Sequence, residues 1–261
     1  MDSRLHIIAG YKEGKSYVKD LYVSPPFRVV SVGQRKKDHK LYQIVMSSSP
    51  GILDGDRYQL DIALEKGAAL QLQSQSYQRL FNMKDRAVQQ LNISMQDNTS
   101  FAYVPHPVVP HEDSNFKSKA EINIGENSQI IISEIITCGR KHYGELFKLK
   151  SFQNLTEIYH KDKLVVKDNI LIQPDLIPIK SIGNLEEYTH QGTLIFYTTK
   201  KHVDKNALIE TIYAHIELQS EMEIGISAME DNGFIIRTLG HGGEVMYNFF
   251  LTVQEILWEL E

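Results

Sequence analysis

The residue that most invites a chemical role is an acidic one inside an apolar segment. Glu134 stands in the run 130–136, which otherwise holds isoleucines and one serine. Alternation along a strand places Glu134 on the same face as Ile132 and Ile136, the face expected to point into the core. A carboxylate in that position has to be paired, hydrated or functional, because burying an unpaired charge is costly.

Two interpretations of Glu134 follow from its neighbours in the sequence. Arg140 and Glu145 come shortly after it, and a pairing of Glu134 with Arg140 would make an internal salt bridge. The other interpretation is a hydrated path through the interior with polar walls, to which Ser74 and Ser76 contribute from the corresponding place in an earlier strand pair. The sequence leaves both interpretations open.

Histidines are the next candidates, because imidazole is a favoured ligand of several transition metals. His106 and His111 flank a proline-rich stretch, 105–110, whose three prolines keep the chain extended. Their rings are therefore expected to lie apart in surface loops rather than to share an ion. His142 near Cys138 could form a soft site, but a lone cysteine in this setting is expected to be a small core residue.

Common catalytic signatures are missing from the sequence. It has no phosphate-binding loop and no nucleophile elbow of the Gly-x-Ser-x-Gly kind. The Gly-rich segment 239–243 lacks the spacing of a dinucleotide site, and we expect it to be a turn before the last helix. No tightly bound cofactor is expected, and the chain is not expected to be an enzyme.

Charge and cysteine content narrow the cellular setting. The net charge of −5 gives no general attraction to nucleic acid or to an anionic membrane, and the short basic run 35–37 indicates a solvated turn. The single cysteine cannot form an internal disulfide, which suits a reducing compartment. We see no signal peptide and no apolar run of the roughly 20 residues that a membrane helix needs. A cytoplasmic protein is the expectation.

Alternating apolar and polar residues predict a mainly β fold. Three units, each with two strands and a short turn, begin their alternation at Leu60, Leu91 and Ala120. Their apolar positions match without a gap, as in a repeat of about 30 residues. The sequence therefore predicts stacked β-hairpin layers resembling a β-helix, although any three hairpins of similar length would align this well. Further strands are predicted at 146–159, 164–172 and 192–199.

The last part of the chain changes period. Helical spacing predicts one helix over 204–217 and a second, amphipathic helix over 244–260, with short strands at 224–228 and 234–239 between them. We interpret the chain as a single domain, 1–261, with a β body to about 200 and an α+β part from about 201. The default role of the last helix is to cover a sheet. A partner contact through its apolar residues is the alternative, and these residues are Val253, Ile256, Leu257 and Leu260.

Several short motifs, taken in order, resemble the UreD (UreH) family of urease accessory proteins. They are Pro25-Pro26-Phe27, the Ser-Pro-Gly...Gly-Asp pattern of 49–56, the polar strand end 74–76, the Pro-x-Pro-x-x-Pro stretch 105–110, and Glu-x-x-x-x-Gly-Arg-x-x-x-Gly-Glu over 134–145. They span about 24–147, and the resemblance is thin after about residue 180. Ile52 and Ile132 depart from the family pattern, which often has Gly and Trp at these positions.

The resemblance implies a function as well as a fold of stacked β layers. Members of this family join a UreF-like accessory protein and a UreG-like GTPase, and the assembly docks on apo-urease. Nickel in transit passes through a water-filled passage in the family member. For this chain the resemblance implies Asp56, Glu134 and Glu145 as transient nickel contacts, with Ser74, Ser76 and Arg140 in the polar wall.

A different class of function is the alternative. A β-solenoid enzyme acting on a polysaccharide could use Asp54, Asp56 and Glu134 as acid and base, since two carboxylates at a suitable separation can hydrolyse a glycosidic bond. The sequence shows little of the exposed aromatic platform that sugars need. A structural interaction domain without a metal role is the third possibility.

Overall fold

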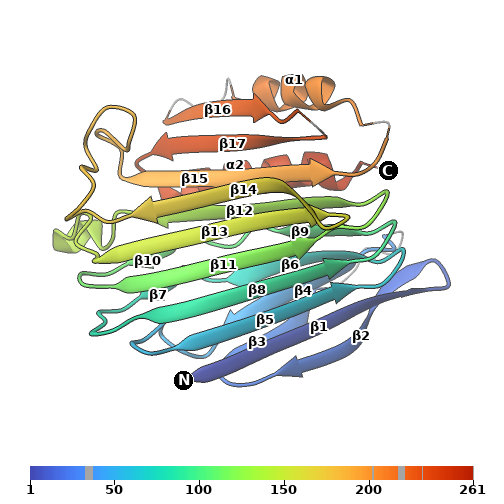
Figure 1. The fold of residues 1–261 in the computed structure, drawn as a ribbon, viewed down its shortest axis with the longest axis horizontal. Helices are drawn as coiled ribbons and strands as arrows, with labels where there is room; N and C mark the ends of the chain where they lie inside the picture. Colours follow the sequence, from blue (N-terminus) through green and yellow to red (C-terminus); the bar gives the residue numbers. More distant parts are fainter. Residues whose placement is uncertain (33–37, 202, 217–220, 231, 261) are drawn as a thin grey trace.

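Two large β-sheets form the body of the protein (Figure 1). The computed structural model describes residues 1–261 except 33–37, 202, 217–220, 231 and 261, so the basic run 35–37 lies outside the described residues. Sheet A consists, in spatial order, of β14 (Lys163–Ile172), β13 (Ser151–His160), β11 (Asn115–Asn123), β8 (Ala87–Met95), β5 (Arg57–Leu64), β1 (Asp2–Lys12) and β2 (Lys15–Val23).

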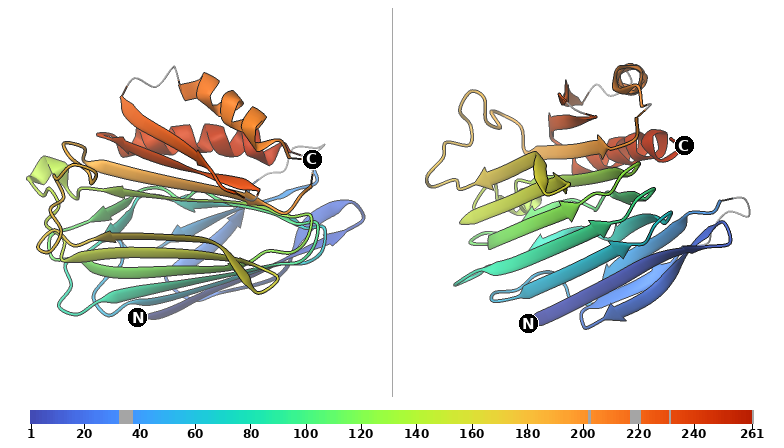
Figure 2. Two further views of the ribbon diagram at one scale, coloured as in Figure 1. Left: turned by 45° about the horizontal axis from the view of Figure 1, so that its top comes forward. Right: turned by 45° about the vertical axis from the view of Figure 1, so that its right-hand side comes forward.

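Sheet B lies behind sheet A in Figure 1, and the two layers separate clearly in Figure 2. Its main path consists of β16 (Met222–Ala228), β17 (Gly233–Gly240), β15 (His190–Thr198), β12 (Gln129–Thr137), β9 (Ser100–Tyr103), β6 (Ala69–Gln75), β4 (Leu41–Ser47) and β3 (Phe27–Ser31). The short strands β7 (Gln78–Leu80) and β10 (Val108–Pro110) pair with each other beside this path. Because β15, β17 and β16 extend sheet B, this sheet continues into the C-terminal part of the chain.

The chain winds from one sheet to the other in turns that stack in register. Leu60 lies opposite Leu91, and Leu91 lies opposite Ala120, so successive turns advance by 31 and 29 residues, as the repeat predicts. The two strands of each unit, however, lie in different sheets and do not pair with each other. An alternating strand has the same pattern whether it pairs with its neighbour in sequence or faces it across a core, so the sequence could not distinguish a hairpin from this arrangement.

Strand β12, in the middle of sheet B, is buried on both faces. Ile130, Ile132 and Ile136 of β12 belong to the core between the sheets, whereas Ile131 and Ile135 pack in a second core under α2 (Gly243–Trp258). This double burial explains why the β12 sequence is an almost continuous apolar run rather than an alternating one. It also confirms that Glu134 shares a face with Ile132 and Ile136.

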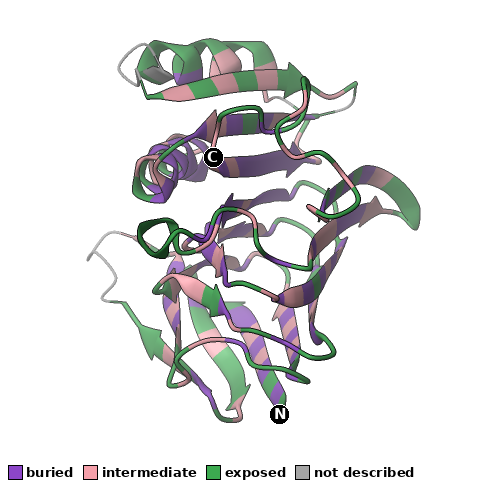
Figure 3. Ribbon diagram, turned by 90° about the vertical axis from the view of Figure 1, so that its left-hand side faces the viewer, coloured by how far each residue is buried: buried purple, intermediate pink, exposed green. Residues whose placement is uncertain are grey.

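The C-terminal helices differ in how far they are buried (Figure 3). Helix α1 (Lys205–Ile216) is mostly exposed, and Asp204 caps its N-terminus, because Asp204 Oδ1 accepts hydrogen bonds from the amides of Asn206 and Ala207. Helix α2 follows the glycine-rich turn, with Gly242 in the N-cap position, as predicted. Both helices begin within one residue of the predicted positions.

Two features of the fold differ from the prediction or lie outside it. The strand expected from Leu146 begins only at Ser151, because the preceding segment forms a 3-10 turn, η1 (Lys141–Tyr143), followed by bends. Residues 1–47 contribute four strands, β1–β4, that the sequence pattern did not reveal. Strands β1 and β2 pair antiparallel at the edge of sheet A, where β2 is largely exposed and shows weak alternation.

The apolar face of α2 is core, which corrects the partner-binding hypothesis for two of its residues. Val253 and Leu257 are fully buried in the core under the helix. Ile256 and Leu260 are partly exposed and are the only two of the four candidates still open to a partner. The helix end is also held by polar contacts, because Trp258 Nε1 donates to Tyr42 Oη at 3.1 Å and Gln129 Nε2 donates to the Leu257 carbonyl at 3.3 Å.

Replacing Leu257 with alanine tests this core role. We expect Leu257→Ala to lower the free energy of unfolding by about 2–5 kcal/mol, because it opens a cavity between α2 and sheet B. Glu255→Ala, on the exposed side of the same helix, should change it by less than about 0.5 kcal/mol. Chemical denaturation followed by circular dichroism measures both values, and equal stability of the two variants would contradict the assignment.

Candidate functional site

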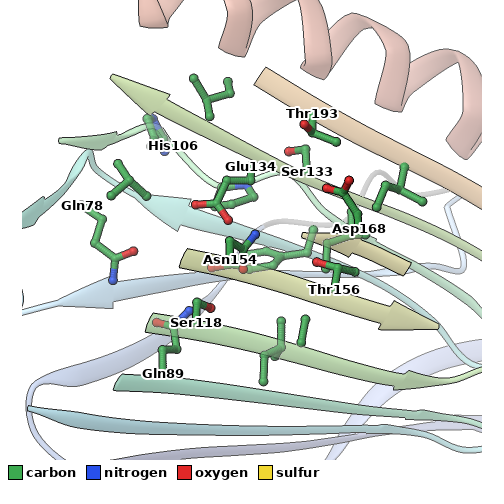
Figure 4. Close-up of a pocket in the computed structure, with 18 of the residues that line it drawn as sticks. Gln78, Gln89, His106, Ser118, Ser133, Glu134, Asn154, Thr156, Asp168 and Thr193 are labelled. Atoms are coloured by element: carbon green, nitrogen blue, oxygen red, sulfur yellow. The ribbon is translucent and has the colours of Figure 1, made fainter. Parts of the chain in front are cut away.

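A polar cavity of about 60 Å³ lies between the two sheets (Figure 4). A buried water needs at least about 15 Å³ of such space, so the cavity has room for about four waters. Side chains from both sheets line it, and the polar ones are Gln78, Gln89, Tyr103, His106, Ser118, Ser133, Glu134, Asn154, Thr156, Asp168 and Thr193. A polar space of this kind is unusual in a core whose buried residues are mostly apolar.

The stacking of sheet A creates one wall of the cavity. Tyr58, Gln89, Ser118 and Asn154 lie opposite one another on β5, β8, β11 and β13, and each is near the start of its strand. They occupy the same inward face as the apolar row two residues further on, which contains Leu60 and Leu91. On β5, β8 and β11 this row is polar while the next inward row is apolar, whereas on β13 the next inward residue is Thr156, which also lines the cavity.

Glu134 reaches into the cavity from the opposite sheet. It lies in register with Thr193 of β15, and Figure 4 shows its carboxyl group above Asn154 and beside Asp168. Burial raises the pKa of Glu134 to about 8, a hydrogen bond with Asn154 opposes this rise, and the charge of Asp168 adds to it. The side chain keeps some exposed surface because it opens on the cavity. Glu134 is therefore a mainly neutral carboxylic acid at pH 7.

A larger cleft of about 580 Å³ adjoins the cavity. Ser74 and Ser76, predicted as wall residues, line this cleft, together with Ser47, Ser49 and other residues at the ends of β4 and β6. The cleft and the cavity share five lining residues, which form the neck between them: Gln78, Gln89, Tyr103, Pro105 and His106. The two spaces are therefore adjacent, and the cleft opens on the surface side of the cavity's shared lining.

His106, which the sequence analysis expected in a surface loop, is one of several lining residues that sequence reasoning did not assign to the cavity. Its backbone amide donates to Ser74 Oγ at 2.8 Å, its Nδ1 lies 3.2 Å from the same oxygen, and its ring stacks on Tyr247 of α2. Burial lowers the pKa of His106, so the imidazole is neutral at physiological pH, the form that binds metals. The signal was available, because Ser74 and His106 follow the ends of adjacent layers and are 32 residues apart, close to the repeat length.

Asp56 lies outside both spaces. One carboxylate oxygen of Asp56 pairs with the amino group of Met1 at 2.8 Å and the other accepts from the amide of Leu53 at 2.8 Å. The motif that contains Asp56 instead forms a closely packed loop. A Cβ atom at Gly51 in this motif would lie 2.4 Å from the Arg79 carbonyl oxygen. Asp56 therefore stabilises the loop before β5, and the structure does not bring it together with Glu134.

Glu145 and Arg140 also lie away from the cavity. Arg140 forms a bidentate ion pair with Glu145, which excludes the interpretation that Arg140 pairs with Glu134. Glu145 Oε2 accepts from the amide of Glu112 at 3.3 Å, and Gly139 has a φ of 113°, which favours glycine. The Gly-Arg-x-x-x-Gly-Glu part of the motif thus closes a surface loop. Glu134, the first residue of the whole motif, is the one that faces the cavity.

The remaining metal candidates do not converge. His111 packs on Phe81 with ring centroids 4.8 Å apart, whereas His106 packs on Tyr247. Cys138 is buried and burial raises its thiol pKa, while His142 is exposed. Within the described part of the chain, no three His, Cys, Asp or Glu side chains are grouped so that they could hold a metal ion together.

The fold and the cavity define a class of protein: a β-helix-like, two-sheet fold with a polar cavity in its core. The family described as UreD urease accessory protein matches residues 1–260, and the chain belongs to this family. Among similar proteins, the urease accessory protein UreD of Flavobacterium johnsoniae is 48% identical over 261 residues, covering 100% of this chain and 94% of that protein.

More distant relatives carry the same name. The UreD of Acetivibrio thermocellus is 31% identical over 258 residues, covering 98% of this chain and 97% of that protein. The UreD of Haemophilus influenzae is 33% identical over 257 residues, covering 94% of each. These similarities extend beyond residue 180, where the motifs read from the sequence had become thin.

The raised pKa of Glu134 predicts a specific pH dependence of stability. Between pH 4.5, the ordinary pKa of an unfolded glutamate, and about 8, the folded chain holds a proton that the unfolded chain has released. Stability contributed by this group therefore falls as pH rises through that window. We expect Glu134→Gln to be more stable than the parent at pH 7 by roughly 1–3 kcal/mol and equally stable at pH 4.5.

Denaturant titrations of both proteins at several pH values measure this difference. Comparing the two chains cancels the other titrating groups, among them His190, whose pKa burial lowers to about 4. A stability difference that does not change between pH 4.5 and 8 would show that Glu134 is ionised in the folded protein.

Proposed function

We propose that this chain is a maturation scaffold that joins UreF-like and UreG-like accessory proteins to apo-urease, and that nickel passes through its interior. Membership of the UreD family supports the role in urease maturation. The observation that supports the nickel route is a polar cavity that holds Glu134 inside a largely apolar core and shares His106 with an adjoining cleft. In this proposal the chain acts in the cytoplasm and is not an enzyme.

The donor set of the route suits a cation in transit. Nickel accepts imidazole and oxygen ligands, and His106, Glu134 and Asp168 offer these among amides and hydroxyls. Glu134 must lose its proton to bind the ion, which weakens binding near pH 7 and favours release. A route with one or two strong ligands at each point lets an ion move, whereas a closed cage would retain it.

The structure favours neither the carbohydrate enzyme nor a membrane role. Asp54 Oδ1 accepts from the amide of Asp85 at 3.0 Å, and neither Asp54 nor Asp56 lines the cavity that holds Glu134. The paired carboxylates that glycoside hydrolysis requires are therefore not assembled by these three residues. None of the helices in the described ranges is long and apolar enough to span a bilayer. We propose no nucleic-acid partner and no membrane partner.

Association with the accessory proteins is the first test. We expect the purified chain to form a stable complex with a UreF-like protein and only that complex to recruit the UreG-like GTPase. Size-exclusion chromatography with light scattering measures the masses of the binary and ternary mixtures. Absence of the binary complex would remove the main support for the scaffold. Ile256→Asp and Leu260→Asp test whether the partly exposed end of α2 takes part.

Blocking the cavity is the second test. Glu134→Leu places an apolar side chain of similar volume in the route and removes a buried acid, a change that is often neutral or stabilising. We expect normal folding and partner binding but at least a tenfold loss of urease activation, measured in nickel-supplied cells carrying the urease genes, since roughly 1.4 kcal/mol at a barrier gives a factor of ten.

The same substitution outside the cavity serves as the control. Glu121 lies on the outer face of β11, where Lys119 donates to it at 2.9 Å, and Glu121→Leu should leave urease activation unchanged. Full activation by soluble, partner-competent Glu134→Leu protein would mean that nickel does not pass this residue.

A further inference from the structure

The wall of the cavity formed by β14 lies next to a second hollow of the protein surface, separate from the cleft. Asp168 of β14 lines the cavity, and the next residue, Asn169, lines a surface groove of about 610 Å³. The groove also contains Gln191, Glu223 and Arg237, from β15, β16 and β17. The cavity and the groove are therefore neighbours. The residues between them decide whether the cavity can open to the surface here as well as at the cleft.

The side chain of Arg237 lies at this boundary. Arg237 forms an ion pair with Asp168 Oδ1 through Nη2, and its Nη1 donates to Thr193 Oγ1 at 2.9 Å. Both partners line the cavity, while Arg237 itself lines the groove. The Asp168 side chain is 9% exposed and that of Arg237 is 46% exposed, so the carboxylate is inside and the guanidinium reaches it from outside.

We propose that Arg237 closes a second mouth of the cavity and occupies Asp168 as a counter-ion in place of a divalent cation, so that a passing metal ion must displace it. This inference rests on the proposed nickel route. It adds to that route a gate and an exit towards the groove. It also adds two residues, Asp168 and Arg237, that the family motifs in the sequence did not include.

Electrostatics favours this role. With Arg237 in place, the charge of Asp168 is compensated and no longer attracts another cation to the cavity. With Arg237 released, Asp168 and Glu134 present two carboxyl groups beside Thr193 and Asn154, all oxygen donors that a divalent cation accepts. The closed and open states therefore differ in metal affinity, which a gate requires.

The groove provides a place for the released side chain. Arg237 lies in register with Gly225, and Glu223 is two residues away from that position on the same strand face. Diagonal neighbours of this kind are within reach of long side chains. The Glu223 carboxylate accepts a hydrogen bond from Tyr188 Oη at 3.3 Å and lines the same groove. Arg237 can thus exchange a buried carboxylate for an exposed one without losing a partner.

Nickel binding to the untagged full-length chain tests the gate directly. Isothermal titration calorimetry with nickel chloride should show that Arg237→Gln binds nickel at least about tenfold more tightly than the parent, because the competing counter-ion is gone. Arg28→Gln removes the same charge from an exposed position on β3 and should leave the affinity unchanged.

Arg237→Lys is a second variant that keeps the test decisive if Arg237→Gln does not fold. Lysine keeps the charge near Asp168 but lacks the planar fork that also holds Thr193, so its nickel affinity should lie between those of the parent and Arg237→Gln. Circular dichroism checks that each variant is folded. Affinities of both Arg237 variants equal to that of the parent would overturn the gate.

Glu134→Gln separates failure of the gate from failure of the route. If this substitution weakens nickel binding while the Arg237 variants match the parent, the route stands and the gate is wrong. If neither Glu134→Gln nor the Arg237 substitutions change nickel binding, the cavity does not take the ion and both proposals fall.

Discussion

The structure depends on burying one row of polar side chains between two sheets whose other inward rows are apolar. Buried polar groups have to find hydrogen-bonding partners or water. Here the row that contains Gln89, Ser118 and Asn154 faces Glu134 across a small polar cavity. The apolar rows on the same strands supply the stability that lets this space persist, because they form the continuous core between the sheets.

The second core, under α2, also helps to keep polar side chains in the interior, because it holds sheet B in place. Sheet B is fixed from behind by a helix whose buried residues include Phe249, Phe250 and Leu257. With both faces of β12 held, Glu134 cannot turn away from the cavity to reach solvent, and burial shifts its pKa upward. The same helix carries Tyr247, on which His106 stacks at the neck of the route. One packing arrangement thus positions both the imidazole and the carboxyl group.

The ion pair beside the cavity differs in its role from the ion pairs elsewhere on the surface. Arg140 and Glu145 join two parts of one surface loop, and Asp56 joins the N-terminus to the loop before β5. These contacts stabilise connections and leave their charges fully compensated. The pair of Asp168 and Arg237 differs because its acidic partner lines a cavity and its basic partner is half exposed. In the proposed gate this is the pair that opens.

The sequence by itself determined the stacking of the layers, the two C-terminal helices and the inward direction of Glu134. Each follows from periodicity: a repeat of about 30 residues, helical spacing, and the parity of a strand whose isoleucines flank one carboxylate. Ordered motifs also indicated the family, which the comparisons confirmed over nearly the whole chain. These are properties of neighbouring residues or of equivalent positions in successive layers, so the pattern of one chain contains them.

Tertiary structure alone decided which polar residues share the route. Asp56, Glu145 and Arg140 are close to the motifs in sequence but are used in loop contacts, whereas His106, Asn154 and Asp168 come together from separate layers. Whether the strands of each unit pair or face each other was also undecided, since both arrangements give the same alternation. The direction of a side chain across a core depends on the register of strands distant in sequence, and only the assembled sheets fix that register.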